Sequence, residues 1–216
     1  MTWGTQAGKG ATASRAVEKA PTTLYDRDYY RTLLDGNRRT TQKYRMALVA
    51  HENACKTGLA LDLLDNEIKQ GKKVVIIDVD NSASSTVDYV YPDADNITII
   101  PLLDEADDSI YHEDNSIDHM ALVNKTKWFI NLLAEDIEKD PDAYGGIVFD
   151  GGSTFLKWCE FAMRQSLLAK GIIENEDDSF NQKEWRERNR LNRDVLDRLH
   201  ALPVPKIFNT FNLKDA

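Results

Sequence analysis

The stretch MALVAHENACKTG, residues 46–58, decides the fold. Its first five residues, 46–50, form a short apolar run typical of a buried strand, and residues 51–54 are a polar turn. Apolar residues then recur at helical spacing from Leu59 to Ile68, and Gly71 closes that helix. Residues 74–77, Val-Val-Ile-Ile, are expected to form a strand covered on both faces. Strand, turn, helix and strand make a βαβ unit.

The same alternation continues to the end of the chain. Further strands are expected at residues 97–100, 146–149 and 205–210, and further helices at 120–137, 155–170 and 185–202. Short apolar strands that alternate with longer helices predict an α/β fold, a mostly parallel sheet flanked by helices.

Composition bounds the kind of protein. The chain has 216 residues, which suits one domain, with a formal charge of -9. We expect a flexible N-terminal arm at 1–20, a basic aromatic lead-in segment at 21–43 and a core at 44–216. No apolar run reaches the roughly 18 residues of a membrane span, and the N-terminus does not resemble a secretory signal. We therefore expect no membrane partner and a cytoplasmic location, the host cytoplasm if the chain is viral.

The turn between the first strand and the first helix indicates phosphate chemistry. It has the length and the Lys-Thr ending of the phosphate-binding loop G-x-x-x-x-G-K-[ST], with Ala50 and Cys55 in place of the two glycines. In this interpretation Lys56 reaches the β- and γ-phosphates of a nucleotide and Thr57 is a ligand of Mg²⁺. The alternative is a plain strand, loop and helix with an exposed lysine. The residues expected to bind the nucleotide are His51, Glu52, Asn53, Ala54, Cys55, Lys56, Thr57 and Gly58.

Polar residues follow three of the other strands. The run Asp78-Val79-Asp80 ends one, Asp150 ends another, and Asn209-Thr210 ends the last. In an open α/β sheet the ligand lies outside the carboxyl ends of the strands, where a carboxylate can orient or deprotonate water or hold Mg²⁺ through water. The alternative for the first run is a turn or a helix cap.

In order, spacing and strand chemistry, residues 44–214 resemble a RecA-like P-loop NTPase core, particularly the compact RecA-type ATPases of phage and archaeal genomes. The resemblance implies ATP and Mg²⁺ as cofactors. It places Asp80 where the family usually carries the catalytic Glu, Asp150 at the end of the Walker B strand and Thr210 at the γ-phosphate sensor. It implies catalytic roles for Asp80, Lys56 and Thr210, and metal binding by Thr57 and Asp150.

The resemblance also implies a function and partners. The expected function is an ATPase acting in DNA recombination, annealing or replication, with single-stranded DNA as a partner and with nucleotide between the subunits of a homo-oligomer. Because the chain is acidic, a nucleic acid has to be met by a local patch, and Arg186, Arg190 and Arg193 share one helix face. The alternative for these arginines is a solvated amphipathic face with ion pairs between residues four apart. The alternative, favoured by the missing glycines, is a degenerate RecA-like module with a structural or assembly role and little or no hydrolysis.

Overall fold

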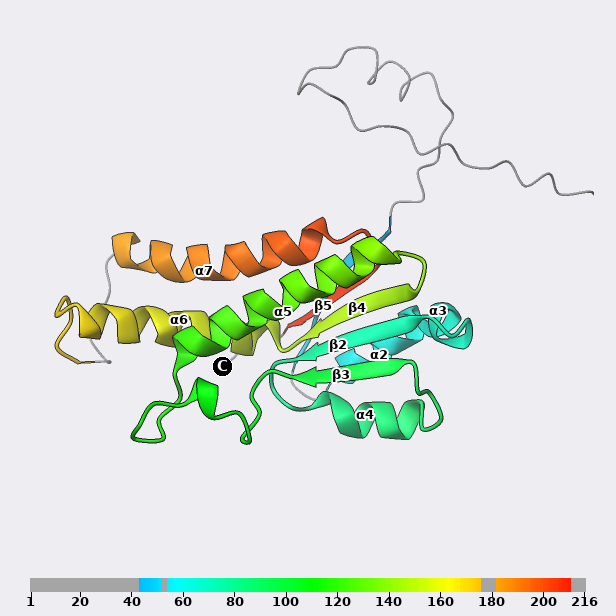
Figure 1. The fold of residues 1–216 in the computed structure, drawn as a ribbon, viewed down its shortest axis with the longest axis horizontal. Helices are drawn as coiled ribbons and strands as arrows, with labels where there is room; N and C mark the ends of the chain where they lie inside the picture. Colours follow the sequence, from blue (N-terminus) through cyan, green and yellow to red (C-terminus); the bar gives the residue numbers. More distant parts are fainter. Residues whose placement is uncertain (1–42, 52–53, 176–181, 211–216) are drawn as a thin grey trace, which may run out of the picture. The chain divides into compact units, whose positions relative to one another are not determined.

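A five-stranded parallel sheet flanked by helices forms the part of the chain that follows residue 42 (Figure 1). The computed structural model describes residues 43–51, 54–175 and 182–210. The strand order is β1-β5-β4-β2-β3, and every pair of neighbours is parallel. The strands are β1 (Arg45–Val49), β2 (Lys73–Asp78), β3 (Ile97–Pro101), β4 (Tyr144–Asp150) and β5 (Lys206–Thr210). The predicted α/β class with a parallel sheet flanked by helices is confirmed. The expected arm at 1–20 and residues 21–42 of the lead-in segment lie outside the described residues.

The helices divide between the two faces of the sheet according to the direction of each connection. Connections from β1 to β2 and from β2 to β3 run one way along the sheet, and those from β3 to β4 and from β4 to β5 run back. Because parallel crossovers are right-handed, opposite directions put helices on opposite faces. One face carries α2 (Lys56–Leu63), α3 (Asp65–Lys69) and α4 (Ala83–Val90), and the other carries α5 (His119–Lys139), α6 (Gly152–Ala169) and α7 (Gln182–Ala201).

The core follows from alternation along the buried strands. In β2, Val74 and Ile76 pack toward α2, whereas Val75 and Ile77 pack toward α5 and α6. Strands β2 and β4 are covered on both sides, and β4 is buried along its whole length.

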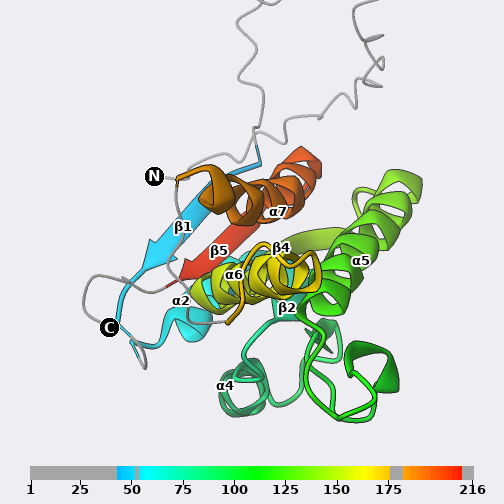
Figure 2. The same ribbon diagram turned by 90° about the vertical axis from the view of Figure 1, so that its left-hand side faces the viewer.

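The expectation of a buried first strand is wrong. Strand β1 is at an edge of the sheet and pairs with β5 alone among the described strands (Figure 2). As a result Met46 is 38% exposed and Val49 is 60% exposed.

Two further details of the helices differ from the prediction. The helix expected from Leu59 to Ile68 is broken at Leu64 into α2 and α3. Helix α4 was not expected, because its sequence is short and rich in Ser and Thr.

A short 3₁₀ turn (Asp108–Ile110) precedes α5. Within the described ranges, none of the helices is long and apolar enough to cross a membrane.

Candidate functional site

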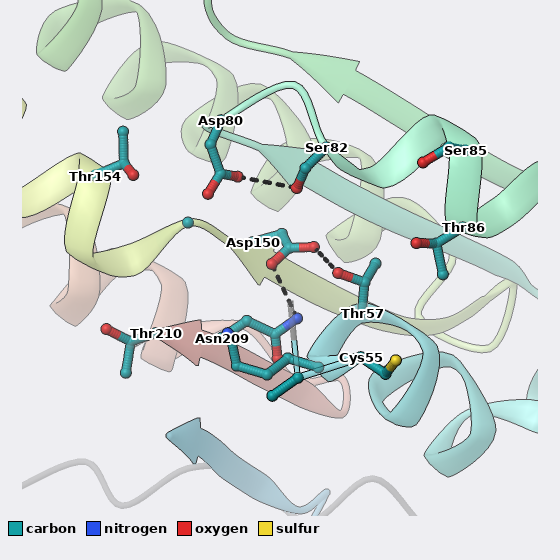
Figure 3. A pocket seen from close by; sticks show the side chains of 13 residues that line it. Cys55, Thr57, Asp80, Ser82, Ser85, Thr86, Asp150, Thr154, Asn209 and Thr210 are labelled. Atoms are coloured by element: carbon teal, nitrogen blue, oxygen red, sulfur yellow. Dashed lines mark hydrogen bonds between the residues drawn. The ribbon is translucent and has the colours of Figure 1, made fainter. Parts of the chain in front are cut away.

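A cavity of about 600 Å³ opens at the carboxyl ends of the central strands (Figure 3). It lies among the N-termini of α2, α4 and α6 and the tips of β4 and β5. The chain leaves β4 toward one face of the sheet and β2 toward the other, so a crevice opens between these neighbouring strands, where α/β proteins bind ligands. Its volume is in the range of small-molecule sites. The lining residues are Ala54, Cys55, Lys56, Thr57, Asp80, Ser82, Ser85, Thr86, Asp150, Gly151, Thr154, Asn209 and Thr210.

The loop before α2 turns at Cys55. This residue has φ 52° and ψ 32°, the left-handed conformation that glycine adopts most easily. A side chain in this conformation costs about 1–2 kcal/mol. The cysteine side chain makes no cap hydrogen bond, so it leaves the N–H groups that begin α2 available to an anion. The backbone thus adopts a glycine-like turn at one of the two positions where the glycines are missing.

Lys56 is the first residue of α2 and reaches back over the loop. Its Nζ donates a hydrogen bond of 2.8 Å to the carbonyl oxygen of His51. The bond spans the loop and holds the ammonium group beside the cavity that Lys56 lines. His51 contributes its carbonyl here, and it is exposed and does not line the cavity.

Three neighbouring strands end in a row of buried polar side chains. Asp78 of β2, Asp150 of β4 and Asn209 of β5 are register partners and are 1%, 4% and 0% exposed. Register partners in a parallel sheet point to the same face, here the face that carries α2 and α4. Asp78 lies at the N-terminus of α4 and Asp150 at the N-terminus of α2.

Asp150 is the centre of this row. One carboxylate oxygen accepts a 2.5 Å hydrogen bond from Thr57 Oγ1, and the other accepts a 3.0 Å bond from Asn209 Nδ2. Figure 3 shows the two bonds reaching Asp150 from α2 and from β5. The start of α2 is thus tied directly to the end of β4, the central strand of the sheet.

Asp78 and Asp80 have different roles, although they are two residues apart. Asp78 accepts hydrogen bonds from the backbone N–H groups of Ser82 and Ala83, so it caps α4. The pKa of Asp78 is raised overall, because the effect of burial exceeds that of the two hydrogen bonds, which lower it. The helix-cap interpretation therefore applies to Asp78.

Asp80 faces the cavity. Its Oδ1 accepts a 3.3 Å hydrogen bond from Ser82 Oγ, and the carboxylate lies over Gly151. Partial desolvation raises the pKa of Asp80, and the nearby carboxylates of Asp150 and Asp78 raise it further. A carboxylate with a raised pKa that reaches the cavity is suited to accept a proton.

Thr210 ends β5 on the opposite face from Asn209. Its Oγ1 lies 2.6 Å from Ser153 Oγ in a hydrogen bond in which either hydroxyl can be the donor. Because Thr210 also lines the cavity, its hydroxyl is placed between α6 and any ligand there.

Most of the residues that the sequence indicates gather in this cavity, namely Ala54, Cys55, Lys56, Thr57, Asp80, Asp150 and Thr210. Two do not line it. His51 supplies only the carbonyl described above, and Gly58 lies within α2, where an added Cβ would approach Thr86 no closer than 3.8 Å. Glu52 and Asn53 lie outside the described residues.

The sequence did not predict the cavity wall that the start of α4 forms, or the hydrogen bond from Asn209 to Asp150. Ser82, Ser85 and Thr86 belong to the start of α4, a helix that was not expected. Asn209 precedes Thr210 in the run that was singled out, but its bond to Asp150 depends on the pairing of β4 with β5. A polar residue inside an apolar strand end was the available signal.

The donor set suits a hard cation that is shared with a ligand. Within the described part of the chain, no three His, Cys, Asp or Glu side chains form a cluster that could hold a metal ion. Mg²⁺, however, is usually bound by one or two carboxylates together with substrate phosphates and water. Asp150 and Thr57 fit that requirement, since a carboxylate and a hydroxyl supply hard oxygen atoms side by side, and the Asn209 amide nitrogen holds the carboxylate.

No protein-family model matches the chain, and no curated protein is significantly similar to it.

Proposed function

We propose that this protein binds a nucleoside triphosphate with Mg²⁺, most simply ATP, and hydrolyses it in the cavity at the carboxyl ends of β4 and β5. The observation that carries the proposal is the hydrogen bond from Thr57 to Asp150. It joins the residue after the loop lysine to the acidic tip of a central strand, in a cavity that Lys56 and Asp80 also line.

The loop and the helix supply the groups that hold phosphate. Lys56 exchanges its bond to the His51 carbonyl for a phosphate oxygen, and the N-terminal N–H groups of α2 donate to the same anion. Thr57 and Asp150 are the residues that would hold Mg²⁺. When bound, Mg²⁺ neutralises charge on the phosphate oxygens. A cation is required because the cavity presents the carboxylates of Asp80 and Asp150 against one ammonium group.

Asp80 and Thr210 act on the reacting end of the nucleotide. Asp80 orients a water molecule and takes its proton while the water oxygen forms a bond to the γ-phosphorus. The bond from that phosphorus to the β–γ bridging oxygen breaks, which yields ADP and inorganic phosphate. Thr210 contacts the γ-phosphate and relays its presence to α6 through Ser153.

Replacement of Asp80 tests the hydrolysis step. Asp80→Asn keeps the shape but cannot accept the proton, so we expect turnover to fall by about 10²- to 10⁴-fold while Mg·ATP still binds. Turnover is measured by phosphate release and binding by calorimetry. Asp88→Asn, an exposed position of α4 outside the cavity lining, is the matched control and retains turnover. Wild-type turnover in the Asp80 variant would contradict the role.

A second candidate is a module that binds nucleotide without turnover. Two observations favour it: Cys55 strains the loop, and Lys56 already has a hydrogen-bond partner in the His51 carbonyl. Asp80 is also one methylene shorter than the Glu usual in the family that the sequence resembles. Mg·ATP binding by the wild type with no phosphate release above background would select this candidate.

The proposed work on single-stranded DNA rests on the resemblance and on one surface of α7. Arg186, Arg190 and Arg193 line a groove of about 500 Å³ together with Asp194 and Asp197. Arginines on one helix face can follow a phosphate backbone, but the two carboxylates weaken that attraction. Binding of a fluorescent oligonucleotide that weakens with salt, and that is lost when Arg186 and Arg193 become Ala, would support the partner. The absence of such binding would remove it.

A further inference from the structure

The amide oxygen of Asn209 is a buried acceptor without a donor. The residue is 0% exposed, and among the described residues nothing donates a hydrogen bond to Oδ1. Its amide nitrogen, by contrast, donates to Asp150 Oδ1 at 3.0 Å. The amide nitrogen is thus satisfied, and the amide oxygen is left buried without a partner in a residue that lines the cavity.

The orientation of this amide is fixed by its neighbour. A rotation by 180° would turn the amide oxygen toward the Asp150 carboxylate, and two acceptors would then face each other. The carboxylate therefore holds the nitrogen on its own side and leaves the oxygen unpaired. Buried polar atoms without partners are uncommon and costly in folded proteins, so this one needs an explanation.

The surroundings indicate which donor would satisfy it. Asp150 and Thr57, the two residues suited to hold Mg²⁺, form a continuous hydrogen-bonded chain with Asn209. Mg²⁺ in protein sites usually keeps several of its water molecules, and those waters are strong hydrogen-bond donors. Groups that orient metal ligands from behind are often decisive for affinity.

We propose that Asn209 is a positioning residue for a hydrated divalent cation, holding the Asp150 carboxylate with its amide nitrogen and accepting from the cation's hydration shell with its amide oxygen. This inference rests on the proposed nucleotide site and deepens it. Asn209 needs no contact with the nucleotide. Its loss is expected to change the requirement for the cation before it changes the interaction with the triphosphate.

The test measures the Mg²⁺ concentration that gives half of the ATP-dependent rise in melting temperature. Asn209→Leu keeps the size of the side chain and removes both hydrogen-bonding groups. We expect it to raise that concentration about 10- to 100-fold, the usual effect of removing a group that orients a metal ligand. Asn209→Ala is the second variant, in case the leucine side chain is not accommodated and the protein fails to fold.

Asn96→Ala is the matched control. Asn96 also donates from its amide, to the carbonyl oxygens of Ile68 and Lys72, but it precedes β3 at the opposite end of the sheet. Its loss lowers the melting temperature and leaves the Mg²⁺ requirement unchanged. A merely structural role for Asn209 would give the same result as this control.

The outcomes separate the inference from the function on which it rests. If wild-type protein responds to Mg·ATP and a folded Asn209 variant needs no more Mg²⁺ than wild type, the inference is wrong and the nucleotide site stands. If wild-type protein responds to neither ATP nor Mg·ATP, the proposed function is wrong and the inference falls with it. A raised Mg²⁺ requirement in the Asn209 variants alone supports both.

Discussion

Cys55 holds a backbone conformation that most side chains avoid, at the point where the loop turns into α2. Its φ is 52°, and among the described non-glycine residues positive φ is otherwise found at Asn81 and Asn115. Asparagine tolerates this region better than cysteine. Strain of this kind persists only where the surrounding structure imposes it, and it is concentrated at functional sites. Cys55 lines the cavity, so this strain lies at the candidate site.

The strain at Cys55 predicts an order of stability. Cys55→Gly removes the conflict and is expected to be as stable as wild type or up to about 1 kcal/mol more stable, whereas Cys55→Val is expected to lose about 1–2 kcal/mol. Urea unfolding measures both changes. We also expect the valine variant to lose the response to Mg·ATP, because its loop relaxes.

Asn115→Val is the control for this prediction. Asn115 has φ 62° and lies outside the cavity lining, so its replacement lowers stability without changing the response to Mg·ATP. A Cys55→Val protein as stable as wild type would show that the loop does not require a left-handed residue.

The candidate site was partly predictable residue by residue. Lys56, Asp80 and Asp150 were placed together because the carboxyl ends of parallel strands meet at one edge of a sheet. Asn209 was not assigned a role, because its partner is set by strand register, which the sequence does not state. The division of labour between Asp78 and Asp80 likewise required the position of α4.

At the scale of elements, the junction of β4 with α6 controls the position of Asp80. Gly151 joins the two with φ 97°, and a Cβ added there would lie 2.8 Å from Asp80 Oδ1 and 2.9 Å from the Cβ of Val79. The junction is therefore closed to any side chain, both by its backbone and by its neighbours.

Gly151→Ala is expected to lower the free energy of unfolding by about 1–3 kcal/mol and to reduce ATP turnover, because the new methyl group displaces the Asp80 carboxylate. Gly171→Ala is the matched control. Gly171 also has positive φ, 65°, but nothing lies within 4 Å of its added Cβ, so only the backbone strain remains. Equal losses of stability and unchanged turnover in the two variants would contradict the prediction.

The opposite end of β5 contains a buried cation. Lys206 is 4% exposed, and its ammonium group donates to the carbonyl oxygen of Leu202. Burial, and then the nearby Arg45, lower the pKa of Lys206 from 10.5 to about 8. At a pH between about 8 and 10.5, the folded state therefore binds fewer protons at Lys206 than the unfolded state does.

The stability of the protein is expected to depend on pH through Lys206. Because the unfolded chain binds the extra proton, stability is expected to rise as the pH increases from about 8 toward 10.5, and the cost of the buried charge is fully present below that window. Urea unfolding at several pH values measures it. Lys206→Met lacks the ionising group, so the difference between wild type and variant isolates its effect. A difference that does not change with pH would contradict the assignment.

At the scale of the whole molecule, the order of the strands and of the helices other than α4 could be predicted, and the exposure of β1 could not. All five strands follow from short apolar runs, and the parallel sheet follows from their alternation with helices. The exposure of β1 depends on which strand lies beside it, and the break at Leu64 depends on how two short helices fit the sheet. Non-local pairing decides these features.

The same topology explains why the cavity and its polar side chains lie at one end of the sheet. Right-handed crossovers send α2 and α4 to one face and α6 to the other, so their N-termini converge on the tips of β4 and β5. Their partial positive charges favour an anion at a place where the side chains include Asp80 and Asp150. An anion would balance the positive charge of the helix N-termini, and a cation bound with it would balance the two carboxylates.

Calorimetric titration of Mg·ATP into wild type and Lys56→Ala tests the central claim most directly, with Lys69→Ala, an exposed lysine of α3 paired with Asp65, as the control. Binding to one site in wild type and in the control, weakened at least about 10-fold in Lys56→Ala, is the predicted result, a difference of about 1.4 kcal/mol or more. Equal affinity in all three proteins, or no binding to wild type, would contradict it.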